Sequence, residues 1–144
     1  KPMINKILSD GASYPKLVTW IGAPNATSVD EWARSFQVES ALDLVLLLKA
    51  TGGGWLFETE IILPPFETEY LDYAEVVNEK HSGLGLPSDL WIYHEGAWLS
   101  AYSRRTGLYC QLDGNYGTVT SYESMDRWYI ELIRNEYAQR YGLK

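Results

Sequence analysis

The histidines and the single cysteine are the residues from which metal or nucleophilic chemistry would most readily be built. His81 and His94 lack a His-x-x-x-His or other metal-ligand spacing, and a His-Glu pair like the one at His94 is common at strand ends without a metal. Cys110 alternates with leucines, which predicts a small buried side chain in a strand rather than a reactive thiol. The sequence therefore predicts no metal site, no cofactor and no nucleophile beside a base.

Two further patterns could serve chemistry. The glycines Gly52 to Gly54 follow an apolar helix rather than a strand and lack the Lys-Ser/Thr ending of a nucleotide loop, so they predict a turn with close backbone approach. Glu58 and Glu60 would share one face of a strand, and paired carboxylates can flank a glycosidic bond. An acidic binding surface is the simpler interpretation. We expect no enzyme, while a small-ligand-binding or hydrolytic protein with an aromatic cleft stays open as an alternative.

Acidic residues are concentrated in the middle of the chain. The formal net charge is −7, and the segment from Glu58 to Glu95 contains nine acidic residues and one lysine. Such a field repels phosphate backbones and attracts basic surfaces, so we expect a basic protein as partner and no direct contact with nucleic acid. An ordinary solubilising face is the alternative interpretation.

Aromatic residues add to the candidate contact surface. The chain has six tryptophans and eleven tyrosines. Trp32 and Trp128 lie on helical apolar stripes and are predicted to be core, whereas Trp91 and Trp98 flank a predicted hairpin, where we expect at least one to be exposed. Arg104 and Arg105 occupy a predicted loop tip, either as a solvated turn or as a contact. The predicted partner-binding residues are Glu58, Glu60, Glu67, Glu69, Asp72, Trp91, Glu95, Trp98, Arg104 and Arg105.

The composition favours one globular domain over residues 1–144. With 46% hydrophobic and 22% charged residues, the chain can bury a core of the usual size for its length. A single cysteine excludes an intramolecular disulfide and suits a reducing compartment, so we expect a cytoplasmic protein. The longest apolar run, Ala41 to Leu48, is far shorter than the ~20 residues of a membrane span, so no membrane partner is expected.

The order of predicted elements indicates an α+β fold. Helices are predicted over residues 3–8, from a capping box at 28–31, over 40–51, over 68–83 and behind a second capping box at 120–123. Strands are predicted over 55–57, 60–63, 90–93, 97–102, 108–112 and 117–119. We therefore expect an antiparallel meander sheet of about five to six strands, packed by N-terminal and C-terminal helices.

The middle of the chain resembles the signature of the SMI1/KNR4 (SUKH) superfamily. A leucine-rich helix runs into Thr51-Gly52-Gly53-Gly54-Trp55-Leu56-Phe57, followed by an acidic strand at residues 60–64. The later strands, a Gly-x-Val strand at 117–119 and a closing helix after Ser121-Tyr122-Glu123 follow the order of that family. The resemblance covers residues 28–137.

The resemblance implies a SUKH-like fold and a role in binding other proteins. Many members are immunity proteins that bind and neutralise a cognate bacterial polymorphic toxin, frequently a nuclease. An acidic surface suits such an inhibitor, because it can occupy the basic groove that would otherwise hold phosphates. An intracellular scaffold or regulatory module of the SMI1/KNR4 type is the alternative that the family offers. The family's interfaces vary, so no contact residue is transferred from it.

Overall fold

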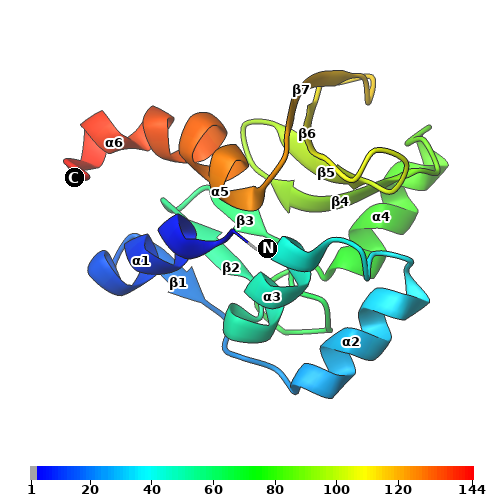
Figure 1. The fold of residues 1–144 in the computed structure, drawn as a ribbon, viewed down its shortest axis with the longest axis horizontal. Coiled ribbons are helices and arrows are strands. Elements are labelled where there is room, and N and C mark those ends of the chain that lie inside the picture. Colours follow the sequence, from blue (N-terminus) through cyan, green and yellow to red (C-terminus); the bar gives the residue numbers. More distant parts are fainter. Residues whose placement is uncertain (1–2) are drawn as a thin grey trace.

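A seven-stranded antiparallel sheet organises residues 3–144, which are the residues that the computed structural model describes (Figure 1). Its strands are β1 (Val18–Trp20), β2 (Gly54–Leu56), β3 (Glu60–Ile62), β4 (Leu90–Glu95), β5 (Leu99–Ser103), β6 (Tyr109–Leu112) and β7 (Thr118–Tyr122). Each strand pairs with the next in sequence, which confirms the predicted meander and the α+β class. The predicted number of strands is too low, because β1 is a three-residue strand whose own sequence is too short to show alternation and which is held by pairing with β2.

Helices pack around this sheet. They are α1 (Asn5–Ser13), α2 (Ala26–Ser35), α3 (Leu42–Thr51), α4 (Ala74–Gly83), α5 (Met125–Trp128), the π-helical segment η1 (Tyr129–Arg134) and α6 (Asn135–Tyr141). In Figure 1, α4 lies beside β4, while the run from α5 to α6 extends from β7 to the C-terminus. None of the helices in the described residues is both long and apolar enough to cross a membrane.

Two helices begin at caps other than the predicted capping boxes. The side chain of Asn25 accepts a hydrogen bond from the Ser28 backbone at 3.0 Å, so α2 begins at Ala26. Residues 120–122, predicted as part of a cap, belong to β7 because they pair with β6. Ser124 is instead the N-cap of α5, because its side chain accepts a hydrogen bond from the Arg127 N–H at 3.1 Å.

Helix α4 begins six residues later than the Thr68 start predicted from the sequence, at Ala74. The Ala74 N–H donates to the carbonyl of Pro64, directly after β3. One turn on, Asn78 donates to the Ile92 carbonyl and accepts from the Ile92 N–H. The Asn78 carboxamide thus satisfies the edge of β4 at the point where β3 has ended, and this tertiary contact fixes the position of α4.

The three consecutive glycines form the predicted turn with close backbone approach. Gly52 ends α3 in the left-handed conformation, with φ 74°. A Cβ on Gly52 would overlap the carbonyl of Gly22, and one on Gly54 would overlap the carbonyl of Thr19. The turn therefore needs glycine both for its backbone angles and because the segment of residues 19–22 passes directly against it.

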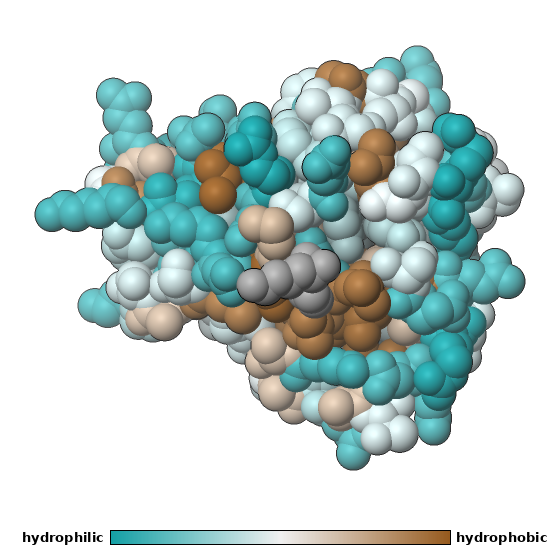
Figure 2. All heavy atoms as spheres, in the orientation of Figure 1, coloured by the Kyte–Doolittle hydropathy of each residue, from teal (hydrophilic) through white to brown (hydrophobic). Residues whose placement is uncertain are grey.

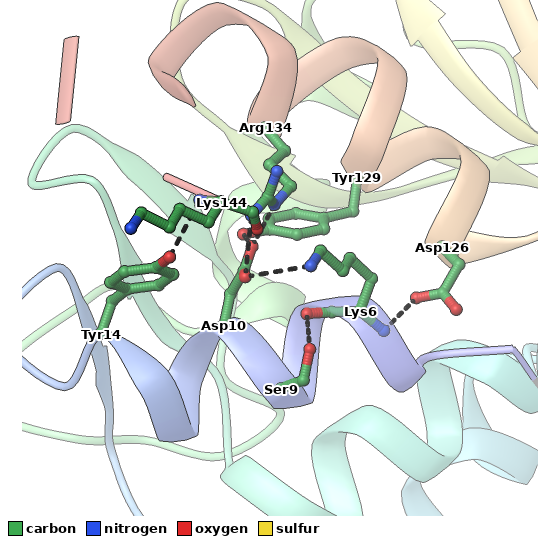
Figure 3. Close-up of polar contacts among 8 residues, drawn as sticks. All are labelled: Lys6, Ser9, Asp10, Tyr14, Asp126, Tyr129, Arg134 and Lys144. Atoms are coloured by element: carbon green, nitrogen blue, oxygen red, sulfur yellow. Dashed lines mark hydrogen bonds and ion pairs between the residues drawn. The ribbon is translucent and has the colours of Figure 1, made fainter. Parts of the chain in front are cut away.

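Buried carboxylates connect the N-terminal segment to the C-terminal helices. Asp10 of α1 accepts hydrogen bonds from the Tyr129 hydroxyl at 2.6 Å and from Arg134 Nε at 2.7 Å (Figure 3). These two partners are five residues apart, the spacing at which hydrogen bonds repeat in the π-helical segment η1. Asp126 accepts from the Asn5 and Lys6 N–H groups at the start of α1. The expected short N-terminal helix is thus longer than predicted and fixed at both ends.

The core contains most of the predicted apolar residues. Trp32, Trp128 and Cys110 are buried, as expected from their helical or strand periodicity. Helix α3 is buried on most of its sides but not on all of them. Leu42 and Leu46 are exposed, and Figure 2 shows apolar side chains gathered over this helix.

Candidate functional site

Three predicted acidic residues line one hollow at the surface. Glu69 and Asp72 come from the loop between β3 and α4, and Glu95 comes from the end of β4. We call this the acidic hollow; it has a volume of about 390 Å³ and is also lined by residues including Ile61 and Tyr70. None of its lining residues, all within the described chain, is a lysine or an arginine. Residues separated in the sequence therefore present carboxylates to the same volume of solvent.

The pairing of β3 with β4 places Glu95 at the hollow. Ile61 is the register partner of Glu95, so both side chains lie on the same face of the sheet. The Glu95 carboxylate is 34% exposed, and its Oε2 lies 3.9 Å from His81 Nε2. At that distance the two groups do not form a hydrogen bond, so the carboxylate stays free to meet a partner.

One exposed aromatic side chain lines the hollow, and another lies in the turn that follows Glu95. Tyr70 is 64% exposed and lines it directly, and Trp98 is 47% exposed in the turn between β4 and β5. The prediction that at least one of Trp91 and Trp98 is exposed is confirmed by Trp98. Glu67 is also exposed and lies in the same loop as Glu69. Exposed aromatics beside carboxylates are typical of protein contact surfaces.

Glu60 is a correction to the predicted contact residues, because it is only 2% exposed. Its carboxylate accepts hydrogen bonds from His94 Nε2 at 2.7 Å, from the Tyr137 hydroxyl at 2.7 Å and from the Ala97 N–H at 3.4 Å. Burial alone would raise the pKa of Glu60, but the hydrogen bonds from His94 and Tyr137 and the charge of His94 outweigh it and lower that pKa below 4.5. Glu60 is thus an internal acceptor that attaches the C-terminal helix to the sheet.

The same cluster contains a serine, a histidine and a carboxylate in hydrogen-bonded order. Ser100 Oγ lies 2.8 Å from His94 Nδ1, and Trp128 Nε1 donates to the same Oγ at 2.9 Å. The order of serine, histidine and carboxylate is that of a hydrolytic triad, but the ring nitrogens are exchanged, with the serine on Nδ1 and Glu60 on Nε2. Ser100 and His94 are both 0% exposed, however, so a substrate cannot reach the hydroxyl in this conformation. The arrangement joins β3, β4, β5 and α5 as a buried polar network.

Glu58 does not share a strand face with Glu60, which corrects the paired-carboxylate interpretation. It lies in the β2–β3 turn with φ 72°, exposed and outside the set of residues that line the acidic hollow. Trp91 is 5% exposed and stacks on Phe36 with ring centroids 4.9 Å apart, so it is a core residue rather than an exposed anchor.

The two predicted arginine contacts differ from each other. Arg104 donates to the Phe36 carbonyl at 2.6 Å and to the Ser88 carbonyl at 2.9 Å, so its guanidinium is used within the fold. Burial lowers the pKa of Arg104, although the charges of Asp89 and Glu39 act in the opposite direction. Arg105 is exposed, and its Nε lies 3.6 Å from Oδ2 of Asp89. The interpretation as partner contacts is therefore wrong for Arg104 and remains a prediction for Arg105.

Tyr70 falls inside the helix predicted over residues 68–83 and is not among the predicted contact residues, although it is exposed. The segment from 66 to 73 is a loop, because α4 begins only at Ala74. The later start of α4 depends on tertiary contacts of Ala74 with Pro64 and of Asn78 with Ile92, for which residues 66–73 carry no local signal. The candidate site that results contains Glu67, Glu69, Tyr70, Asp72, Glu95 and Trp98.

No protein-family model matches this chain, and a search of the curated proteins finds no match.

Proposed function

We propose that this chain is a protein-binding domain of the immunity type, which neutralises a cognate bacterial toxin by contacting a basic surface of that toxin through the acidic hollow. The observation that carries the proposal is the convergence of Glu69, Asp72 and Glu95 on one hollow, with no lysine or arginine among the described residues that line it. Like charges held close together repel one another. A positively charged partner would offset this repulsion, so the arrangement favours binding to a basic surface.

The exposed aromatic residues support binding to a protein rather than to a free cation. Tyr70 lines the hollow, and Trp98 is exposed three residues after Glu95. Such large, stiff side chains contribute much of the energy of protein interfaces. The carboxylates would accelerate association and select a basic partner. A toxin that cleaves nucleic acid is a suitable partner because its substrate groove carries positive charge.

The test is to reverse the three carboxylates together and to measure neutralisation and binding. A Glu69→Lys/Asp72→Lys/Glu95→Lys variant should lose protection against a toxin encoded beside its gene in a co-expression assay. Its association rate with that purified toxin should fall by about 10- to 100-fold at low salt, and the wild-type rate should fall as ionic strength rises. An unchanged rate and full protection would remove the acidic-hollow mechanism.

A matched control separates this surface from net charge. Glu31, Glu123 and Glu136 are exposed and none lines the acidic hollow, so reversing all three to lysine makes the same charge change elsewhere. The control variant should keep protection. Equal losses of protection in both variants would show that binding depends on overall charge rather than on the acidic hollow. A binding partner that is not a toxin would instead favour the scaffold or regulatory role.

A further inference from the structure

A second concave surface lies along α4 and is lined by different residues from the acidic hollow. Helix α4 turns Glu75, Asn78, Glu79 and Ser82 toward it, which are positions i, i+3, i+4 and i+7 of one helical face. The opposite wall includes Phe36 and Trp91. This groove has a volume of about 400 Å³, which is in the range of sites that bury a side chain or a small ligand.

Stacked aromatic rings form an apolar wall of the groove. Trp91 lies 4.9 Å from Phe36, with an interplanar angle of 26°, and 5.9 Å from Trp32 in an edge contact. The guanidinium carbon of Arg104 lies 5.6 Å from the centroid of the Trp91 ring, and the guanidinium donates hydrogen bonds to the carbonyls of Phe36 and Ser88. These contacts hold the wall in place before any ligand arrives, which lowers the entropy lost on binding.

The charge of the groove is set by two carboxylates on α4. Glu75 and Glu79 are one helical turn apart, and neither forms an ion pair or a side-chain hydrogen bond within residues 3–144. Among residues 3–144, Arg104 is the only basic residue that lines the groove, and its guanidinium already donates to the carbonyls of Phe36, Gln37 and Ser88. The groove therefore combines an apolar wall with two available negative charges.

We infer that this groove is an anchor site for a lysine side chain, an inference that rests on the proposed binding of a basic protein. The butyl stem of a lysine would lie against Phe36, Leu90 and Trp91, and its ammonium group would lie between the carboxylates of Glu75 and Glu79. Lysine suits the site better than arginine, because a guanidinium already covers the Trp91 ring and a compact ammonium fits between two carboxylates one turn apart.

The inference can be tested on the free protein with small probes. The full chain, labelled with ¹⁵N, is titrated with Nα-acetyl-lysine methylamide and, in parallel, with the norleucine analogue, which has the same stem without the ammonium group. The Trp91 indole N–H is the main reporter; it is buried and has no hydrogen-bond partner among the described residues, and a Trp91→Phe spectrum assigns its signal. Saturable shifts at Trp91, Asn78 and Ser82 are expected with the lysine probe.

Selectivity for the charge is the decisive result. Apparent affinity for the lysine probe should exceed that for the norleucine probe by about 1.5- to 5-fold, the range that corresponds to the free energy of an exposed ion pair. Glu75→Gln/Glu79→Gln should remove this preference while the remaining amide signals keep their positions. Equal affinities for the two probes, no saturable shift, or shifts confined to the acidic hollow would each overturn the inference.

The variant at the acidic hollow separates this result from the proposed function. Glu69→Lys/Asp72→Lys/Glu95→Lys leaves every residue of the groove in place, so its lysine titration at Trp91 should match that of the wild type. Loss of toxin neutralisation in that variant tests the acidic hollow alone. Loss of lysine selectivity in Glu75→Gln/Glu79→Gln tests the groove alone.

Discussion

Glu60 and Glu95 lie on neighbouring strands but occupy opposite environments. Glu60 is 2% exposed and accepts three hydrogen bonds, whereas the carboxylate of Glu95 is 34% exposed and borders the acidic hollow. Glu95 pairs with Ile61, the residue next to Glu60, so the alternation of side chains along β3 sends the two carboxylates to different faces. The comparison shows that strand register decides which face of the sheet a carboxylate occupies, and that the elements packed on that face decide whether it is buried.

The largest expected effect comes from removing the buried carboxylate. Glu60→Ala leaves His94 Nε2, the Tyr137 hydroxyl and the Ala97 N–H without their acceptor. The free energy of unfolding should fall by about 3 kcal/mol, because unpaired buried polar groups are costly. Urea denaturation measures it. A loss of less than about 1 kcal/mol would show that this network contributes little to stability.

Acid should weaken the contribution of Glu60 selectively. Its pKa is lower in the folded protein than its ordinary value of 4.5, so the folded state favours the ionised form. The stabilisation is fully present above pH 4.5 and is lost as the pH falls through the folded pKa. The difference in the free energy of unfolding between wild type and Glu60→Gln should therefore stay constant from neutral pH down to about pH 4.5. It should shrink as the pH falls further, through the folded pKa of Glu60. Denaturation midpoints measured across this range give the comparison, and a difference that grows in acid would contradict the assigned direction.

The smallest expected effect on stability belongs to Glu95. Glu95→Gln removes only the loose contact to His81 at 3.9 Å, so the free energy of unfolding should change by less than about 0.5 kcal/mol. Its association rate with a basic partner should fall while its denaturation midpoint stays in place. If Glu95→Gln destabilised the protein as much as Glu60→Ala, Glu95 would also be a structural residue, and the two carboxylates would not differ in role.

Regular periodicity was the part of the fold that the sequence predicted well. Trp32 and Trp128 follow helical apolar stripes, and Cys110 follows strand alternation, so their burial could be predicted from neighbours a few residues away. The glycines at 52–54 likewise indicated a close approach of chain segments, although not which segments approach. The strand β1 carries no such local signal because its pairing partner, β2, lies far along the chain.

The candidate site could be predicted only in part, for a related reason. The excess of acidic residues between 58 and 95 was visible in the sequence, and Glu69, Asp72 and Glu95 do lie together. Glu60 and Trp91 could not be separated from them, because burial depends on which elements cover a strand. The sequence also did not indicate that the guanidinium of Arg104 donates a hydrogen bond to the carbonyl of Phe36, because the two residues are far apart along the chain.

By itself, the sequence determined the α+β class, the antiparallel meander and the negative charge of the central segment, because these follow from local periodicity, turn residues and composition. Only the tertiary structure decided which carboxylates face solvent together and which accept hydrogen bonds inside. That decision depends on the register of β3 against β4 and on the docking of α4 and the C-terminal helix, and these contacts join residues far apart along the chain.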